Sequence, residues 1–413
     1  MKPITRFEHE KLNIGQEGFT KQHWDAFVKY NELHNNQFFD VLYNGIRFNQ
    51  YVGIIQVGNF AVEINPKADK YDSTEKWQDV LLPMLKACGR IKAKSADAAN
   101  LKKQNLNLLE VYFEYYLREI DLLIHSGLVK KYRKETSNVK ALKGKLDFAG
   151  NIRHNLVHKE RFYTSHQVYD VNHKIHQILN VALEIVDKFS SNSRINDVCK
   201  RVRMSFPEVA KINVNEQILN GIVLDRKTAP YERALELAKF IILNYSPDIK
   251  VGNQKMIALL FDMNQLWEEY VYVKLRKEIH SENSEFNGYT IQAQHSKGFW
   301  GNNSLQPDIV LKKGDETYVI DTKWKIPGNS ASVEDLRQMY AYARFWNAEK
   351  VMLLYPGDRE YSGFRAYKNR EHDAILHECM MGFVSVLNKE EAITNTKLNQ
   401  NIAIQVLNMI TPD

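Results

Sequence analysis

Residues 306–324 read QPDIVLKKGDETYVIDTKW, and this stretch decides the fold of the C-terminal third of the chain. Two runs rich in Val, Ile and Leu flank the turn residues around Gly314, a pattern typical of two strands joined by a tight connection. Asp308 begins the first run and Asp321 lies near the end of the second. Pairing of the two strands therefore brings both carboxylates together.

Side chains alternate between the two faces of a strand, so Asp321 and Lys323 are expected on one face. Thr322 and Trp324 are then expected on the other. Hydrolysis of a phosphodiester needs a hard cation held by oxygen ligands, together with a cationic group near the attacking water. A Mg²⁺ ion between Asp308 and Asp321 would lower the pKa of a bound water, and the Lys323 amine would offset charge. The sequence predicts a nuclease site.

The order of elements around this hairpin supports the prediction. A helix is expected over 258–279, a strand over 289–294, a helix over 333–346 and a strand over 351–355, which gives the order α-β-β-β-α-β. Two other Asp-x-Lys triplets, at 225–227 and 248–250, lack an acidic partner on a preceding strand. The alternative interpretation is a solvated hairpin with an ordinary ion pair.

Two positions extend the candidate set. Glu268 lies on the expected helix before the sheet, at the edge of a buried stripe that contains Trp267, and Glu269 is its rival. Gln338 lies on the helix after Lys323 and would orient that amine or touch phosphate. By spacing alone, each of these residues is equally compatible with a polar surface position.

The rest of the chain predicts an α+β multidomain protein. Strands are expected over 51–57 and 60–66 with a turn between them, after another turn at Asn44-Gly45. Helices are expected around 77–87, then over 106–123, 169–189 and 232–243, and 95–104 is a candidate linker. This pattern predicts three domains: an N-terminal β-containing unit (1–105), a mainly helical middle (106–255) and a C-terminal α/β domain with the restriction-endonuclease-like fold (256–413).

The composition narrows the class of protein. The chain has 413 residues, 44% hydrophobic and 26% charged, and no apolar run approaches the ~20 residues that cross a bilayer. No signal peptide is expected, and three scattered cysteines suit a cytoplasmic protein with no membrane partner. No nucleotide-binding P-loop occurs.

The distribution of charged residues and histidines allows more than one interpretation. The net charge of +6 permits DNA binding. A basic segment over 130–159 is either a solvated helix-and-turn surface or a strip that contacts phosphate or an acidic partner. Two histidine pairs, His154 with His158 and His173 with His176, have helical spacing, but without nearby acids or cysteines a zinc site is not expected.

Several motifs resemble one family, McrC, the nuclease subunit of McrBC-type, GTP-dependent, 5-methylcytosine-specific restriction systems. The resemblance rests on LWEEY (266–270), PD (307–308), DTKW (321–324), QMYAY (338–342), LLYP (353–356), ALKGKLDF (141–148), YVGII (51–55) and EINPK (63–67). The segment 141–148 is the most specific of these motifs, because other nucleases of the PD-(D/E)xK class lack it. One departure is His176, where the family tends to have asparagine.

The resemblance implies a Mg²⁺-dependent DNA endonuclease whose site contains Glu268, Asp308, Asp321, Lys323 and Gln338, with the three acids as metal ligands. It also implies a partner, a McrB-like AAA+ GTPase ring that this chain would enter and stimulate. Residues 130–153 become a candidate contact for the partner or for DNA. The alternatives are a stand-alone PD-(D/E)xK nuclease of DNA repair or mobile elements, and a GTPase-activating subunit that does not cut.

Overall fold

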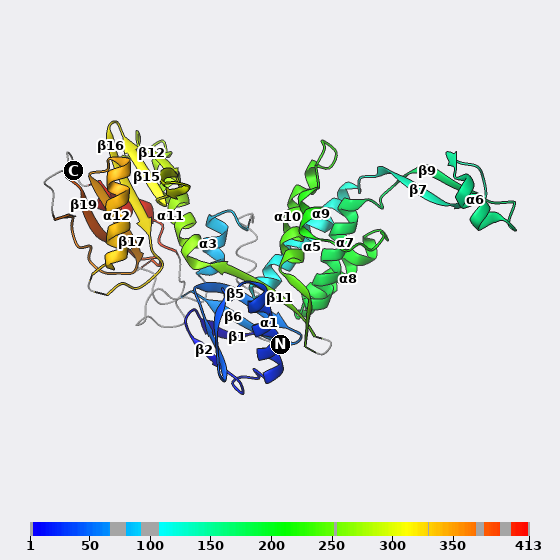
Figure 1. The fold of residues 1–413 in the computed structure, drawn as a ribbon, viewed down its shortest axis with the longest axis horizontal. Coiled ribbons are helices and arrows are strands. Elements are labelled where there is room, and N and C mark those ends of the chain that lie inside the picture. Colours follow the sequence, from blue (N-terminus) through cyan, green and yellow to red (C-terminus); the bar gives the residue numbers. More distant parts are fainter. Residues whose placement is uncertain are drawn as a thin grey trace. The chain divides into compact units, whose positions relative to one another are not determined.

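The computed structural model describes residues 3–66, 80–91, 107–251, 254–328, 330–368, 376–388 and 398–411. Within these residues the protein is a mixed α and β structure with several sheets (Figure 1). No helix of the described segments is long and apolar enough to cross a membrane. The expected linker at 95–104 and the start of the helix expected at 77–87 lie outside the described residues.

The chain forms two compact units. The first contains mainly residues 99–259, together with 56–61, and the second contains 2–55, 62–98 and 260–413. The second unit is therefore made of segments from both sides of residues 99–259, which form most of the first unit. The second unit combines residues of the predicted N-terminal unit (1–105) and of the predicted C-terminal domain (256–413). This division into two units does not test the three-domain division, which stays a prediction.

The second unit, called here the terminal unit, begins with short strands and one long helix. Their bounds are β1 Ile4–Phe7, β2 Lys11–Asn13, α1 Lys21–Leu33, β3 Phe39–Leu42, β4 Gly45–Phe48, β5 Tyr51–Val57, β6 Phe60–Asn65 and α3 Leu81–Ala87. Strands β2, β4 and β3 form an antiparallel sheet, and β1 pairs in parallel with β6. The strands expected at 51–57 and 60–66, with their turns, are confirmed.

The C-terminal part of the terminal unit contains its largest sheet. The elements are α11 Met263–Ile279, β12 Thr290–Ala293, β13 Lys297–Trp300, β14 Asn303–Leu305, β15 Ile309–Lys313, β16 Glu316–Thr322, α12 Val333–Trp346, β17 Lys350–Pro356, β18 Arg365–Ala366, β19 Glu378–Val384 and α13 Ile402–Ile410. The sheet order is β12-β15-β16-β17-β19-β18. The expected order α-β-β-β-α-β is found, with the additional hairpin β13–β14 inserted before β15.

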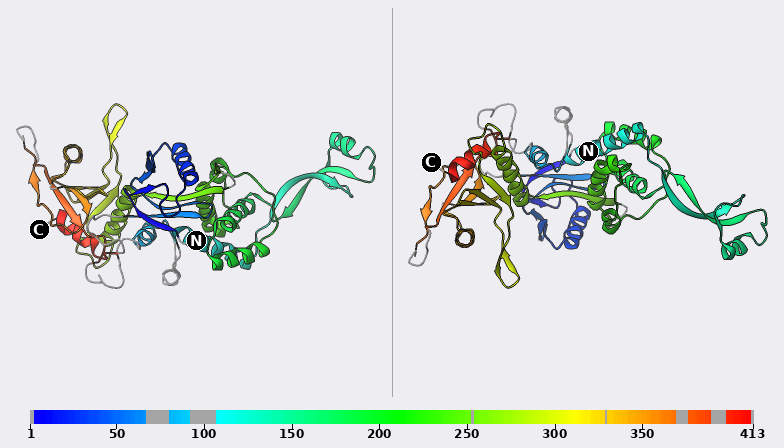
Figure 2. Two further views of the ribbon diagram at one scale, coloured as in Figure 1. Left: turned by 90° about the horizontal axis from the view of Figure 1, so that it is seen from below. Right: turned by 90° about the horizontal axis from the view of Figure 1, so that it is seen from above.

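The centre of this sheet explains why its strands read as continuous apolar runs. Strands β16 and β17 pair in parallel, and α12 connects them. Most of their residues are buried, because helices cover both faces of a parallel segment. On one face Val319 and Val351 pack against Met339 and Trp346 of α12. The helices α11 and α13 also pack on the sheet (Figure 2).

One buried contact ties the N-terminal segment to the end of β16. The indole Nε1 of Trp324 donates to Glu8 Oε1 at 2.7 Å, and both side chains are buried. The backbone N–H of Met263 donates to the carbonyl of Gln50 at 3.0 Å. Residues from opposite ends of the chain thus share one packed interior.

The helix expected over 258–279 begins later than predicted. Residues 254–262 form strand β11 Gln254–Asp262, and Asp262 caps the helix by accepting from the backbone N–H groups of Asn264 and Gln265. The prediction was wrong because IALLF at 257–261 is an uninterrupted apolar run, and a short buried run does not distinguish a strand from a helix.

The first unit, called here the inserted unit, is a helical bundle that carries a long ribbon. Its elements are α5 Leu108–Ser126, β7 Lys131–Val139, β8 Lys145–Leu146, α6 Phe148–Asn155, β9 Phe162–Asp170, α7 Lys174–Phe189, α8 Ser193–Ser205, α9 Glu216–Asn220, a 3-10 turn at Ala229–Tyr231, α10 Glu232–Leu243 and β10 Tyr245–Val251. The helix expected at 232–243 is found at those bounds, and Gly127 ends α5 with φ +87° as expected.

The middle of the chain is mainly helical, as expected, and the ribbon is an addition that the sequence did not predict. Strands β7 and β9 pair antiparallel from Lys131↔Asp170 to Val139↔Phe162, and Figure 1 shows α6 at the end of the ribbon away from the helices. The basic segment 130–159 is an exposed strand, β7, followed by β8 and the short helix α6. The helix expected from residue 169 begins at Lys174, because 169–170 complete β9.

The residue that departs from the resembled family, His176, is a buried neutral histidine. Its ring is 0% exposed, and its Nδ1 lies 2.6 Å from the Val171 carbonyl. Its Nε2 lies 3.0 Å from the hydroxyl of Tyr231, which in turn accepts from the Val129 N–H at 2.9 Å. Burial, reinforced by the neighbouring His173, lowers the pKa of His176 to about 4.

We expect acid to destabilise the fold through this residue. The unfolded histidine titrates near pH 6.5, so between pH 6.5 and 4 the unfolded chain binds a proton that the folded chain does not. From pH 7 to pH 5 this group alone costs about 2 kcal/mol. Urea unfolding at both pH values should show that His176→Asn removes this part of the loss, whereas the exposed control His154→Asn keeps it. Equal pH dependence in wild type and His176→Asn would contradict the assignment.

Candidate functional site

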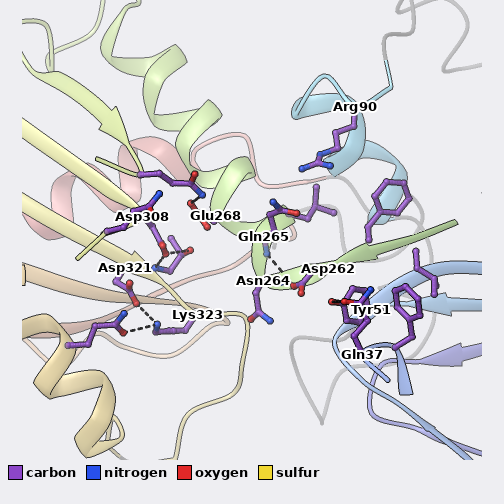
Figure 3. A pocket seen from close by; sticks show the side chains of 18 of the residues that line it. Gln37, Tyr51, Arg90, Asp262, Asn264, Gln265, Glu268, Asp308, Asp321 and Lys323 are labelled. Atoms are coloured by element: carbon purple, nitrogen blue, oxygen red, sulfur yellow. Dashed lines mark hydrogen bonds and ion pairs between the residues drawn. The ribbon is translucent and has the colours of Figure 1, made fainter. Parts of the chain in front are cut away.

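The two acids and the amine of the predicted hairpin lie together in the terminal unit. The register Ile309↔Ile320 makes Asp308 and Asp321 the next facing positions, at the ends of β15 and β16. Asp321 is 2% exposed, and its Oδ2 lies 2.6 Å from Lys323 Nζ. Figure 3 shows the three side chains directed toward one another. The convergence predicted from strand pairing is present.

Thr322 is a functional neighbour that the sequence did not indicate. Its backbone N–H and its hydroxyl both donate to Asp308 Oδ2, at 2.6 and 2.9 Å. Alternation had placed Thr322 on the opposite face, and this expectation was wrong because regular strand geometry ends at Thr322. The two bonds fix the orientation of the Asp308 carboxylate.

The choice between Glu268 and Glu269 is decided by their partners. Glu268 Oε1 accepts a hydrogen bond from Gln294 Nε2 at 2.8 Å, and the side chain lies beside Asp308 in Figure 3. Glu269 instead forms an ion pair with Arg90 at 2.8 Å. Glu268 therefore joins the acid group, as predicted. Gln294, which holds it, had no signal in the sequence.

Gln338 contacts the amine from helix α12. Lys323 Nζ donates to Gln338 Oε1 at 3.2 Å, and Gln338 Nε2 donates to the Tyr342 hydroxyl at 2.8 Å. The Tyr342 hydroxyl donates in turn to the Gln306 carbonyl at 3.0 Å. This chain of bonds holds the Lys323 amine beside Asp321. Tyr342 was not singled out as a site residue, although it lies one helical turn after Gln338.

The three carboxylates of the site carry more negative charge than the Lys323 ammonium neutralises. Burial and the nearby Asp308 carboxylate raise the pKa of Glu268 to about 7. The same two causes raise the pKa of Asp321 to about 6. Burial also raises the pKa of Asp308, although the bonds from Thr322 oppose it. Burial alone would lower the pKa of Lys323, but Asp321 and Asp308 raise it, so the amine stays charged.

These side chains line one cavity of about 750 Å³. One half of the cavity holds the acids and Lys323, and Figure 3 shows Gln37, Tyr51 and Arg90 on the other side. Asn264 and Gln265, from the first turn of α11, lie between the two halves. The cavity is thus built from both ends of the chain.

The donor set suits a hard divalent cation in its chemistry and charge. Mg²⁺ is usually held by one or two carboxylates, with waters and substrate phosphates completing its shell. Among the described residues no group of three or more acids, histidines or cysteines is already arranged to hold a metal ion. Asp308 directs Oδ2 to Thr322 and Asp321 directs Oδ2 to Lys323, so each carboxylate keeps its second oxygen, Oδ1, for a cation.

The histidines and the Asp-x-Lys triplet that were also considered from the sequence form ordinary contacts within the fold. His154 stacks on Tyr163, with ring centroids 4.6 Å apart, and His158 forms an ion pair with Glu160. His173 Nε2 lies 2.8 Å from the Val129 carbonyl. Asp225, from one of the two discarded Asp-x-Lys triplets, pairs with Lys131 and bonds to its own turn. These contacts are structural.

Comparison with known proteins gives a consistent result. The type IV methyl-directed restriction enzyme EcoKMcrBC of Escherichia coli (strain K12) is 21% identical over 229 residues, 53% of this chain. The match spans 64% of that protein's length, less than two thirds.

Two solved structures share the fold. One is a half-complex from a tetradecameric assembly of Thermococcus gammatolerans McrB AAA+ hexamers with bound McrC, with a TM-score of 0.71, 18% identity and coverage of 99% of this chain and 100% of that chain. The other is the cryo-EM structure of the Thermococcus gammatolerans McrBC complex, with a TM-score of 0.50, 19% identity and coverage of 68% and 89%.

The model of one protein family extends over most of the chain. The family is described as McrBC 5-methylcytosine restriction system component, and its model matches residues 46–356. This range includes the motif at 141–148 as well as every candidate site residue. The chain belongs to this McrBC family.

Proposed function

We propose that this protein is the DNA-cleaving subunit of a McrBC-type restriction system, with a Mg²⁺-dependent endonuclease site of the PD-(D/E)xK class in its terminal unit. The observation that carries the proposal is the convergence of Glu268, Asp308, Asp321 and Lys323 on one cavity. A buried carboxylate, Asp321, crowded by two half-buried ones is costly to a fold, and its presence in a cavity favours a functional role.

The residues have distinct parts in the proposed reaction. Asp308 and Asp321 would hold the metal ion, with Glu268 as a further ligand. Bound there, Mg²⁺ supplies a water of lowered pKa and offsets charge on the phosphate. Thr322 orients Asp308 through two hydrogen bonds. Lys323, held by Gln338, places its ammonium where negative charge develops.

The inserted unit is proposed to contact a GTPase ring. Phe148 and Ile152 of α6 and Leu156, the residue that caps its C-terminus, recur every fourth residue and are 73%, 66% and 72% exposed. A stripe of this spacing normally faces a packed interior, so a solvent-facing stripe favours a protein partner. The similar structures are of McrB AAA+ hexamers with bound McrC, which supports an AAA+ ring as that partner.

One reconstitution tests the function. The full chain is mixed with plasmid DNA containing 5-methylcytosine and with or without its AAA+ GTPase, Mg²⁺ and GTP. We expect linear products only when all components are present, and loss of cutting when the metal is chelated. Cutting by the chain alone with Mg²⁺ would favour a stand-alone nuclease. GTPase stimulation with intact DNA under every condition would favour a non-cleaving activator.

A further inference from the structure

A two-stranded hairpin projects from the terminal unit beside the candidate site. Among the described strands, β13 and β14 form a two-stranded sheet of their own, with Lys297↔Leu305 near the base and Trp300↔Asn303 near the turn. Gly301, with φ +55°, makes the turn. Figure 2 shows this segment, yellow in the sequence colouring, extending away from the sheet in both views.

The end of the hairpin exposes an aromatic pair whose members have different roles. Phe299 contacts the ring of Phe345 on α12 edge-on, with centroids 5.4 Å apart. Trp300 is 75% exposed, and within the described residues its indole has no hydrogen-bond or ring partner. Phe299 therefore attaches the hairpin, while Trp300 presents its ring to solvent.

The base of the hairpin is fixed to helix α12. Lys297 Nζ donates to the Phe345 carbonyl at 2.7 Å, and its ammonium lies 4.8 Å from the centre of the Trp346 ring. Trp346 Nε1 donates to His295 Nδ1 at 3.3 Å. Because α12 also carries Gln338, the position of the hairpin is linked to the element that holds Lys323.

Both ends of the hairpin lead directly to the acids of the site. Before it, Gln294 donates through its side chain to Glu268 at 2.8 Å and through its backbone N–H to the Asp308 carbonyl at 2.9 Å. After it, Leu305 is followed three residues later by Asp308. The residues that flank the hairpin, Gln294 and Gln306, line the acid cavity, so the hairpin leaves the sheet at the edge of this cavity.

The composition of the segment favours an anionic polymer as that molecule. No Asp or Glu occurs between Glu285 and Asp308, and the segment contributes His295 and Lys297. The turn offers Asn302, Asn303 and Ser304 as hydrogen-bonding groups. Base faces stack on exposed aromatic rings, and a segment with a cationic side chain and no carboxylate does not repel the phosphate backbone.

We propose that the β13–β14 hairpin is a DNA-contacting element in which Trp300 stacks on, or inserts beside, a base close to the phosphate that is cut. This assignment rests on the proposed nuclease function, because DNA is assigned to the hairpin on the ground that the adjacent cavity cleaves DNA. The hairpin increases the affinity for DNA and positions the DNA strand. It supplies no group to the reaction, so Trp300 is a positioning residue.

The test measures DNA affinity separately from cutting. The full chain, assembled with its GTPase partner, is titrated onto fluorescent duplex DNA with Ca²⁺ in place of Mg²⁺ so that binding is followed without cleavage. We expect Trp300→Ala to weaken binding about 10-fold, in the range that stacking of one base provides. Trp300→Phe should restore most of the affinity. Tyr43→Ala, which removes a fully exposed aromatic side chain elsewhere in the terminal unit, should change nothing.

A second readout places the contact beside the scissile phosphate. A 2-aminopurine base near the cut position should be quenched by wild type and less so by Trp300→Ala. Unchanged affinity and unchanged quenching in Trp300→Ala would overturn the proposal. Trp300→Ala could instead bind DNA as wild type does but lose the GTPase partner or change its oligomeric mass. That result would overturn the proposal, because it would show that Trp300 contacts protein.

Different results would refute the hairpin proposal and the proposed nuclease function. If an Asp321→Asn variant cuts normally, the catalytic assignment is lost, whatever Trp300→Ala does to binding. If Asp321→Asn is inactive while Trp300→Ala binds DNA as wild type does, only the role of the hairpin is lost.

Discussion

Asp321→Asn should reduce DNA cleavage by about 1000-fold or more while leaving the protein folded. The substitution keeps the size of a buried side chain that lies 2.6 Å from Lys323, but it removes the charge that would bind the metal ion. A loss of about 4 kcal/mol of transition-state stabilisation corresponds to about 1000-fold in rate. Single-turnover cleavage by the chain with its GTPase, Mg²⁺ and GTP measures the effect.

The matched control is Asp315→Asn, which removes an exposed acid from the turn of the same hairpin. This variant should cut at the wild-type rate. The melting temperature of Asp321→Asn without Mg²⁺ should equal or exceed that of wild type, because one of three crowded carboxylates has gone. Stimulation of the partner's GTPase should persist. Wild-type cleavage by Asp321→Asn would remove the basis of the nuclease assignment.

Ile152→Asp should abolish productive contact with the GTPase. Ile152 is the middle residue of the exposed apolar stripe on α6 and is 66% exposed. Burying a carboxylate at an interface costs at least about 2 kcal/mol, the size of an interface hot spot, or about 30-fold in affinity. The concentration of the chain that half-maximally stimulates GTP hydrolysis is expected to rise by that factor or more.

Met204→Asp is the control for this variant, because Met204 is an 89% exposed apolar residue in the inserted unit but away from α6, at the end of α8. It should stimulate the GTPase as wild type does. The circular dichroism of both variants should match wild type, since each position faces solvent. If Ile152→Asp stimulates normally, the stripe has another occupant and the partner surface lies elsewhere.

Much of the terminal unit was predictable because its strands carry strong local signals. The hairpin β15–β16, its turn at Gly314 and the helix α12 all follow from short-range patterns. The acids and Lys323 could be placed together because strand pairing and alternation are geometric rules. Glu268 could be proposed from the helical stripe, but only its contact with Gln294 separates it from Glu269.

The ribbon β7–β9 could not be predicted in the same way. Its sequence at 131–139, KYRKETSNV, contains few apolar residues, and a ribbon with solvent on both faces needs no hydrophobic period. Thr322 and Gln294 were missed for a different reason, since their roles depend on side chains that arrive from other segments. The shared interior of the two chain ends, with Trp324 bonded to Glu8, is equally non-local.

The interleaved path of the chain has a consequence for how such proteins can diversify. Residues 99–259 form most of the inserted unit, so a gene can exchange this middle portion as a cassette that keeps both flanks together and leaves behind only the short stretch 56–61 of that unit. An exchange at one crossover would separate Glu8 from Trp324 and Gln50 from Met263 of the same lineage. Recombination that preserves this shared interior is therefore expected to use paired breakpoints, one on each side of the middle portion.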